Sequence, residues 1–412
     1  MPGHETPMAR PRGSASACRF ALVRVLRENA HVSVPSRGLA HHTTTLPGAL
    51  WLGVAHFVVD AACVSAVLRA SPPRDSAVAS ALAFVLAYDF LAFAGQVPFG
   101  WLIDRFALRR GAALGGLVLT ALALVVGRDA GLRVVLLAGA GNALFHVGAG
   151  AMVLAGSQGR AAPAGIFVAP GALGLGLGII LGRKALAAPL WPFYFAIVGA
   201  FIIVGLVAKR AELAPAEAQP APALRRGAIA AIFVLLSFSV AVRSLVGTVG
   251  CEGCPRGLFL MLALPLAGFT GKLVGGLLAD RFGWIDLAMV ALLASAPLLA
   301  FADGDLWLAL PALVMFQMTM PVTLAAALRA LPAWPGFGFG VLCFALVAGT
   351  LPAYLPGGWR PHGWPLLFLV LASAATLYLA LRLLLARSLP QKVSSTAPAP
   401  DSSSSTLCRG LP

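Results

Sequence analysis

The chain consists of long apolar segments separated by short polar connections. Twelve of these segments are long enough to cross a bilayer as helices, which takes about 20 residues each. They run over 47–68, 77–101, 111–127, 132–156, 162–182, 188–208, 227–248, 257–279, 284–302, 305–328, 336–356 and 364–387. Because a helix satisfies its own backbone polar groups inside lipid, the pattern predicts an all-α membrane protein with twelve transmembrane helices.

The longest polar interruption between these spans is the segment 209–226, which mixes charged residues with Ala and Pro. Such a composition is typical of a linker, and it divides the predicted spans into two six-helix bundles. The expected regions are a basic, disordered cytoplasmic tail (1–46), an N-terminal bundle (47–208), a cytoplasmic linker (209–226), a C-terminal bundle (227–387) and a disordered cytoplasmic tail (388–412).

The composition excludes most other classes of protein. Hydrophobic residues make up 59% of the chain and charged residues only 11%. A soluble globular protein carries roughly a quarter charged residues, and a disordered chain has far fewer apolar ones. An outer-membrane barrel would need a polar residue at every second position of its strands. The long apolar runs therefore leave a multi-pass helical protein in the lipid bilayer as the prediction.

The net charge of +15 is interpreted as a signal for orientation, not for nucleic-acid binding. With the N-terminus inside, twenty Lys and Arg lie on the cytoplasmic side and eight on the outer side. This bias predicts that both termini are cytoplasmic, with the protein in the plasma membrane of a bacterium (its inner membrane). An organelle transit peptide is the alternative interpretation of residues 1–46, which are rich in Arg and poor in acids.

One sequence motif occurs twice, at the end of the second predicted span of each half. The stretches 95–106 (GQVPFGWLIDRF) and 271–282 (GKLVGGLLADRF) both end in G-x-L-x-D-R-F, and Asp104 and Asp280 are 176 residues apart. A repeat of two six-helix halves is the layout of transporters that work by rocking one half against the other.

This motif, in these two places, resembles the signature of the major facilitator superfamily. The resemblance covers residues 47–387 and implies that the motif residues gate the cytoplasmic side. The positions that match are Gly100, Asp104, Arg105 and Arg109 in the first copy, and Gly276, Asp280 and Arg281 in the second. The first copy departs from the family pattern at Ala107, and the second at Ile285, where a basic residue is expected.

Shorter stretches resemble the fosmidomycin-resistance-type branch of that superfamily. They are His56–Asp60 (HFVVD), Tyr88–Gln96 (YDFLAFAGQ) and Gly141–His146 (GNALFH). That branch includes drug-efflux proteins and many uncharacterised ones, so the resemblance implies efflux.

Burying a charge in lipid costs several kcal/mol, so an ionisable residue inside a span is a candidate for a functional role. Four of these residues are candidates for proton coupling. They are His56, Asp60, Asp89 and His146. His56 and Asp60 are four residues apart and share one helix face, so a proton can pass between them. The alternative for each of the four is a structural hydrogen bond between helices.

A second set of polar residues inside the spans offers candidates for contact with a substrate. They are Arg243, Gln96, Asn142, Lys272 and Gln317. Arg243 has an alternative role, in which its long side chain extends to the outer headgroups.

The fifth span is rich in glycine, and Gly174, Gly178 and Gly182 form a ridge of small residues that permits close helix packing. Cys251 and Cys254 form an isolated C-x-x-C, which favours either a local disulfide or two free thiols over a zinc site. The chain has no Walker-type phosphate loop and no G-x-S-x-G or H-E-x-x-H motif, so an ATP-driven pump and a hydrolase are disfavoured.

The sequence therefore predicts a secondary active transporter that works by alternating access and couples efflux of a drug or metabolite to protons. Uptake by proton symport and a non-transporting ligand sensor on the same fold are the alternatives. An enzyme acting on lipid-linked substrates would need clustered carboxylates in the outer loops, where only Asp303 and Asp305 are close in sequence. The expected partners are a small-molecule substrate, protons and the bilayer, with no cofactor, metal or nucleic acid, and the expected state is a monomer.

Overall fold

A computed structural model describes residues 45–71, 78–127, 131–183, 189–213, 224–254, 257–355 and 357–386. In this part of the chain the regular elements are all helices. The predicted tails, apart from the first residues of α2, and the centre of the predicted linker, 214–223, lie outside the described residues.

The helices follow one another in the order that the hydropathy pattern predicts. The first half contains α2 (Thr45–Ala70), α3 (Val78–Asp89), the π-helix η2 (Phe90–Ala94), α4 (Gln96–Phe106), α5 (Arg109–Val126), α6 (Leu132–Gly156), α7 (Ala162–Arg183) and α8 (Trp191–Leu213). The second contains α9 (Arg226–Val249), α10 (Leu258–Phe282), α11 (Trp284–Ala300), α12 (Leu306–Gln317), α13 (Met320–Ala330), α14 (Pro335–Tyr354) and α15 (Gly363–Ala386).

The helical spans confirm the predicted fold class. Eleven helical segments among the described residues are long and apolar enough to cross a membrane, and the shorter apolar helix α11 occupies the place of the ninth span. Two spans are interrupted. Leu82–Phe106 passes through the π-helix η2, and Leu306–Ala330 is broken between α12 and α13. Breaks of this kind free backbone groups inside the membrane and are often found at functional sites.

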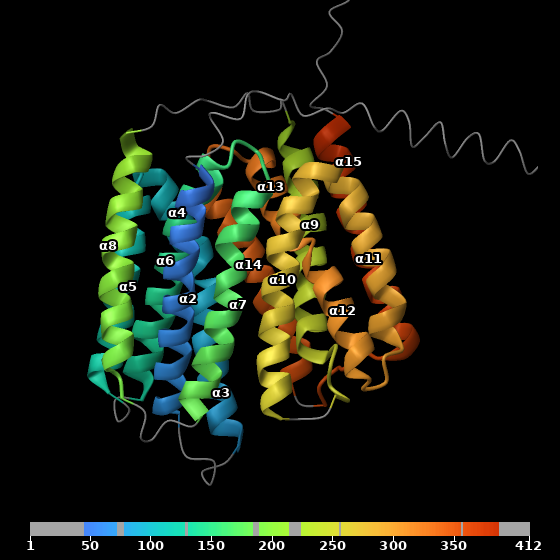
Figure 1. The fold of residues 1–412 in the computed structure, drawn as a ribbon. Coiled ribbons are helices and arrows are strands. Elements are labelled where there is room, and N and C mark those ends of the chain that lie inside the picture. The colour runs from blue at the N-terminus through green and yellow to red at the C-terminus, as the bar shows by residue number, and fades with distance from the viewer. Residues whose placement is uncertain are drawn as a thin grey trace, which may run out of the picture. The chain divides into compact units, whose positions relative to one another are not determined.

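The two halves of the chain meet mainly along two helix pairs. Figure 1 shows one of them, α7 beside α10, and the ideal Cβ position of Gly165 on α7 lies 2.6 Å from the carbonyl oxygen of Lys272 on α10. The other is α4 with α14, where the ideal Cβ of Gly340 lies 2.3 Å from the carbonyl oxygen of Gln96. Within the first half, α2 packs as closely on α7 through Gly174 and Gly178, two members of the predicted glycine ridge.

Some helices extend further than the hydropathy pattern predicts. α8 continues to Leu213, into the segment predicted as a linker, because Ala, Lys, Arg, Glu and Leu are all strong helix formers. α4 and α10 continue to Phe106 and Phe282, so Asp104 and Asp280 stand in a last helical turn and not in a loop.

The connection between α9 and α10 contains a disulfide that joins Cys251 to Cys254, one of the two states left open by the sequence. Glu252, between them, pairs with Arg360 in the connection between α14 and α15. Cys63 and Cys343 are free and buried.

We predict that the close contact between α4 and α14 tolerates no Cβ. Gly340→Ala places a methyl group against backbone, and overpacking of this kind lowers the free energy of unfolding by about 1–3 kcal/mol. The matched control is Gly199→Ala on α8, where no atom lies within 4 Å of the ideal Cβ and the better helix propensity of Ala is expected to be neutral or stabilising. Thermal unfolding in detergent compares the two, and equal melting temperatures would contradict the prediction.

Candidate functional site: a buried charge cluster and two helix-capping aspartates

His56 and Asp60 occupy one face of α2, directed into the protein. The His56 Nε2 lies 3.1 Å from Asp60 Oδ2, as expected for residues four apart on a helix. His56 is almost fully buried, and the Asp60 side chain keeps 16% of its surface accessible. The pair therefore sits at the edge of an accessible space, not in a sealed core.

Two residues of α6 complete this cluster. Asn142 donates from Nδ2 to Asp60 Oδ1 over 2.9 Å, and His146 Nε2 lies 3.6 Å from the same oxygen. His146 Nε2 also lies 2.7 Å from His56 Nε2. The structure thus brings together His56, Asp60, Asn142 and His146, which we name the His–Asp cluster, from two helices that are far apart in sequence.

Backbone carbonyl groups fix the tautomer of both histidines. His56 Nδ1 lies 2.9 Å from the carbonyl oxygen of Phe167, and His146 Nδ1 lies 2.8 Å from that of Asn142. A carbonyl oxygen only accepts hydrogen bonds, so each Nδ1 must carry a proton. In two neutral imidazoles both Nε2 atoms would then present lone pairs to each other.

Two lone pairs at 2.7 Å repel, so this contact is favourable only when one proton lies between the Nε2 atoms of His56 and His146. The two rings then share a single positive charge, which the carboxylate of Asp60 balances at 3.1 and 3.6 Å. The contact geometry is that of an imidazole–imidazolium pair beside a carboxylate.

The same atoms have the chemistry of metal ligands, since ligand atoms of His56, Asp60 and His146 all lie within 4.8 Å of one another. Two nitrogens bound to one tetrahedral zinc ion, each about 2.1 Å away, lie roughly 3.4 Å apart. The two Nε2 atoms are closer than that, at 2.7 Å, so their spacing fits a shared proton better than a tetrahedral metal ion.

α7 covers the His–Asp cluster with a glycine. A Cβ on Gly171 would lie 2.3 Å from His56 Nε2 and 2.8 Å from Asp60 Oδ2, so only glycine leaves room for the rings in this arrangement. Sequence reasoning identified the glycine-rich span but neither this role of Gly171 nor that of the Phe167 carbonyl. Pro170, directly before Gly171, lies inside α7, and a proline within a helix indicates an irregular backbone at that point.

The second half contributes two cations close to the space between the halves. Arg243 on α9 is 3% exposed, and its guanidinium points inward, to the break between α12 and α13. Its Nη2 donates to Thr319 Oγ1 over 2.7 Å, and its Nη1 contacts Met320 Sδ at 3.1 Å and Thr323 Oγ1 at 3.5 Å. This inward direction differs from the alternative in which Arg243 extends to the headgroups. Lys272, on α10, lies within electrostatic range of both Arg243 and Asp60.

The remaining candidates of the sequence lie apart from the His–Asp cluster. Asp89 ends α3, directly before η2, and makes no hydrogen bond or ion pair to the cluster residues. Gln96 is buried and donates to the carbonyl oxygen of Ala92 over 2.7 Å, within its own span. Gln317 ends α12 next to α10, with its Oε1 buried and without a hydrogen-bond partner among the described residues.

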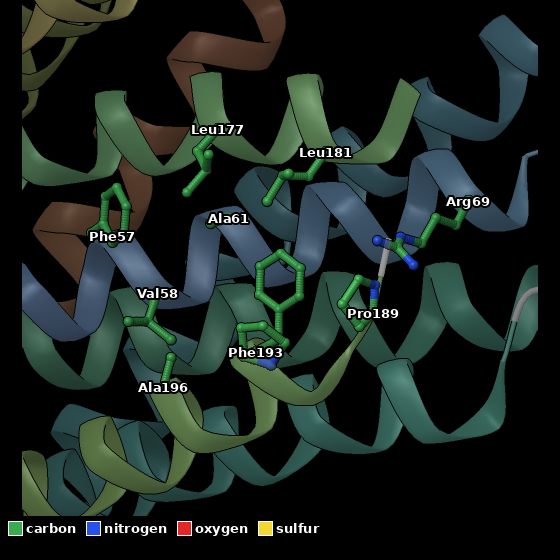
Figure 2. Close-up of a pocket in the computed structure, with 10 residues that line it drawn as sticks. Phe57, Val58, Ala61, Arg69, Leu177, Leu181, Pro189, Phe193 and Ala196 are labelled. Carbon is green, nitrogen blue, oxygen red and sulfur yellow. The ribbon is translucent and has the colours of Figure 1, made fainter. Parts of the chain in front are cut away.

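A separate cavity of about 270 Å³ lies between α2, α7 and α8 (Figure 2). Its walls are apolar side chains such as Phe57, Leu181 and Phe193, with Arg69 at one end. His56 and Asp60 do not line it, because they stand on another face of α2. The cavity is therefore distinct from the His–Asp cluster.

The repeated motif links the two halves through Asp104. Its side chain is fully buried, and its Oδ2 accepts the backbone N–H of Phe337, in the first turn of α14, over 2.8 Å. Arg109 Nη2 lies 3.6 Å from Asp104 Oδ1. A carboxylate at a helix N-terminus is stabilised by the free N–H groups and by the helix dipole, so Asp104 caps a helix of the opposite half.

Asp280 makes the equivalent contact in the reverse direction. Its two carboxylate oxygens accept the backbone N–H groups of Ala161 and Ala162, at the start of α7, over 2.8 and 2.9 Å. Arg160 Nε lies 3.3 Å from Asp280 Oδ2. Each half thus caps a helix of the other with one aspartate, and we call the end of the bundle that holds Asp104 and Asp280 the motif end.

The arginines that directly follow these aspartates do not join the contacts. Arg105 and Arg281 are exposed, and their guanidinium groups lie over the rings of Phe106 and Phe282 at 5.7 and 5.6 Å. The partners that sequence reasoning missed are Arg160 and the helix N-termini. Pro163 and Pro335, in the first turns of α7 and α14, were available signals, because proline is favoured there. Of the two motif glycines, Gly100 packs against the backbone of Gly336, and Gly276 against that of Ala161 and Ala162.

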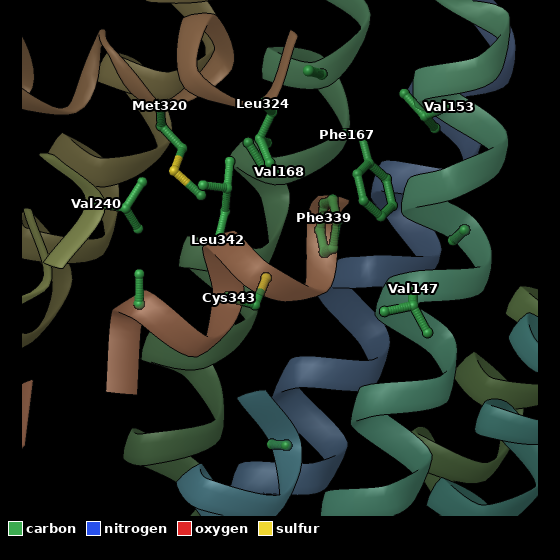
Figure 3. Packing of buried hydrophobic residues seen from close by; sticks show 14 of the residues in the cluster. Val147, Val153, Phe167, Val168, Val240, Met320, Leu324, Phe339, Leu342 and Cys343 are labelled. Carbon is green, nitrogen blue, oxygen red and sulfur yellow. The ribbon is translucent and has the colours of Figure 1, made fainter. Parts of the chain in front are cut away.

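A layer of apolar side chains from both halves packs near the His–Asp cluster (Figure 3). Phe339 of α14 lies 6.5 Å, ring to ring, from Phe167 of α7, and Phe167 in turn lies 4.9 Å from the ring of His56. Phe339 also fills the space above Gly150 of α6. The halves are therefore joined at the motif end by the hydrogen bonds of Asp104 and Asp280, and near the His–Asp cluster by the packing of Phe339 on Phe167.

Comparison with known proteins identifies the fold. No protein-family model matches the chain, and no curated protein matches it by sequence. Among solved structures, the major facilitator superfamily transporter FucP in its outward conformation superposes with a TM-score of 0.54 at 16% identity, over 84% of this chain and 100% of that one. A variant of the E. coli fucose:proton symporter FucP gives 0.53 at 15% identity, over 83% and 98%.

A bacterial homologue of the iron transporter ferroportin, in its outward-facing state, gives a TM-score of 0.51 at 16% identity, over 85% of this chain and 100% of that one. At these identities the likeness concerns the fold. The chain has the twelve-span fold of the major facilitator transporters.

Proposed function

We propose that this protein is a secondary active transporter that couples the movement of a small molecule to protons, with the His–Asp cluster as the proton carrier. The observation that carries the proposal is the 2.7 Å contact between the Nε2 atoms of His56 and His146. Proteins of the same fold include a fucose:proton symporter, which supports transport as the function.

The His56–His146 contact ties protonation to geometry. With the shared proton present, the rings attract each other, and Asp60 balances their charge. Without it, two lone pairs face each other at 2.7 Å, and the rings must move apart or rotate. Loss or gain of one proton therefore changes the conformation of the residues between α2, α6 and α7, which is what coupling requires. The charged or titratable groups that face the pair are Asp60 and, from the other half, Lys272.

Alternating access needs a closure that is stable yet reversible. Each aspartate at the motif end makes charge-assisted hydrogen bonds to a helix N-terminus, worth about 1.5–3 kcal/mol each. Opening of this end exposes the two carboxylates and the two helix starts to water, which can replace those bonds. The contacts are therefore suited to a gate.

The sign of the proton movement on addition of substrate distinguishes antiport from symport. The sequence predicts efflux by antiport, in which substrate and proton move in opposite directions. Symport is the second candidate, because an anion at Lys272 would relieve its repulsion of a proton shared by His56 and His146. A ligand sensor would bind without any flux.

We predict that Asp60→Asn abolishes substrate-driven proton movement, because the shared proton loses the charge that balances it. The protein is reconstituted in vesicles with a trapped pH dye, and phenylphosphonate, fucose and benzyltrimethylammonium are added in turn. The matched control is Asp303→Asn, a change of the same type at an exposed residue between spans.

Proton movement that persists in Asp60→Asn would refute the role of the His–Asp cluster. A signal in the unmodified protein that EDTA abolishes would assign the cluster to a metal ion. A compound that binds but moves no protons in the unmodified protein would favour the sensor.

We also predict that Asp104→Asn loosens the motif end. The loss of about 1.5 kcal/mol from a charge-assisted hydrogen bond would raise the population of the open end about tenfold. The reporter is the buried Cys343 on α14, labelled with a maleimide in a background with Cys18→Ser, Cys63→Ala and Cys408→Ser.

The labelling rate of Cys343 should rise in Asp104→Asn and in Asp280→Asn. Asp286→Asn is the control, since Asp286 stands in the first turn of α11 and caps no helix of the other half. The gate assignment fails if all three variants label at the rate of the parent.

A further inference from the structure

Arg243 is a buried cation whose donors are only partly used. A guanidinium offers five N–H donors, and here they find one close hydroxyl, on Thr319, one distant hydroxyl, on Thr323, and the sulfur of Met320. A thioether is a weak acceptor, and the Nε of Arg243 is buried with no hydrogen-bond partner. A buried charge with so few hydrogen bonds is costly. The guanidinium of Arg243 therefore lacks a binding partner in this structure.

No carboxylate of the described residues supplies that partner. The ion pairs of the described chain involve Asp60, Asp104, Asp280 and Glu252, and none of them includes Arg243. Asp60 already contacts His56, Asn142 and His146 within its own half. The positive charge of Arg243 is therefore available to something that the protein does not itself contain.

Lys272 adds a second cation to the same region. It stands on α10, where Gly271 and Gly275 pack against Val314 and Met318 beside the break that holds Thr319, and its charge interacts with that of Arg243. Asp60 offsets part of this charge, but the two cations still repel each other in a low dielectric. An anion near both would remove the repulsion and satisfy the free guanidinium donors.

The local fold also supports a ligand site here. The hydroxyl acceptors of Arg243 lie at the break between α12 and α13, and broken helices of this kind are used by transporters to hold substrates. Met320 belongs to the buried apolar cluster that also includes Leu342 and Phe339 (Figure 3). A ligand held by its anionic group at Arg243 would find apolar walls beside it.

We propose that Arg243 and Lys272 bind the anionic group of the transported substrate, a carboxylate, sulfonate or phosphonate attached to a small apolar body. This inference rests on the proposed transport function and names the class of its substrate. The guanidinium makes two parallel hydrogen bonds to the anion, and the ammonium neutralises its remaining charge.

The test measures binding to the purified full-length protein in nanodiscs of phosphatidylcholine. The probes share one ring and differ in charge: phenylphosphonate, benzenesulfonate, the neutral benzenesulfonamide and the cation benzyltrimethylammonium. We expect the two anions to bind and raise the melting temperature, and the other two to bind at least about tenfold more weakly.

Variants assign the binding to the two cations. Arg243→Gln should weaken phenylphosphonate binding at least about tenfold, Lys272→Met should weaken it less, and Arg243→Lys should restore part of it. Arg133→Gln, at an exposed arginine near the start of α6, is the matched control and should bind like the parent. Melting curves of the ligand-free variants verify that each is folded, and Arg243→Lys provides the test if Arg243→Gln is not.

Equal binding of benzenesulfonate and benzenesulfonamide, or a preference for the cation, would overturn the proposal. Binding of phenylphosphonate by both Arg243→Gln and Arg243→Lys as tightly as by the unmodified protein would also overturn it. Displacement of phenylphosphonate by added phosphatidylglycerol would assign the site to a lipid headgroup and also overturn it. Anion binding without proton movement in vesicles would support the anion site and refute proton coupling. Proton movement driven only by fucose would support proton coupling and refute the anion site.

Discussion

A charge inside the hydrocarbon core must be neutralised by the protein or by what the protein carries, because water is not there to solvate it. This constraint explains the three polar features of the molecule. Asp60 contacts the imidazoles of His56 and His146, and Asp104 and Asp280 contact helix N-termini of the opposite half. Arg243 has no ion-pair partner among the described residues, which is why it points, together with Lys272, to an anion from outside.

The sequence was sufficient to predict the spans, the repeat and most of the polar residues that the structure places at the site. Each of these depends on a local pattern: an apolar run, a repeated motif, or an ionisable residue within a run. His56 and Asp60 could even be paired, because a spacing of four residues fixes a common helix face. Nothing local, however, tells that His146 meets His56, 90 residues earlier, since that depends on how α2 and α6 are rotated against each other.

Asp89 shows that the sequence alone also fails to exclude residues from the cluster. By sequence it is as good a proton carrier as Asp60, yet it stands apart from the cluster. The π-helix η2 follows it directly and changes the phase of the span, so residues before and after η2 no longer share the faces that a regular helix predicts. The capping partners of Asp104 and Asp280 were missed for a related reason, since backbone N–H groups carry no residue type that a motif search can find.

The distribution of charge between the halves bears on the direction of coupling. All residues of the His–Asp cluster belong to the first half, where the close packing of α2 on α7 holds them together. Arg243 and Lys272 belong to the second half, and Lys272 lies within electrostatic range of His146. A proton shared by His56 and His146 is therefore repelled by Lys272.

An anion at Lys272 would relieve that repulsion, so anion and proton would each strengthen the binding of the other. Mutual strengthening favours a carrier that is either fully loaded or empty, and such a carrier moves both ligands in the same direction. An antiporter needs the opposite, a competition in which one ligand expels the other. If the substrate is an anion held by Arg243 and Lys272, electrostatics thus favours symport over the efflux that the sequence predicts. A neutral or cationic substrate would remove this preference, because it would leave the repulsion between Lys272 and the shared proton in place.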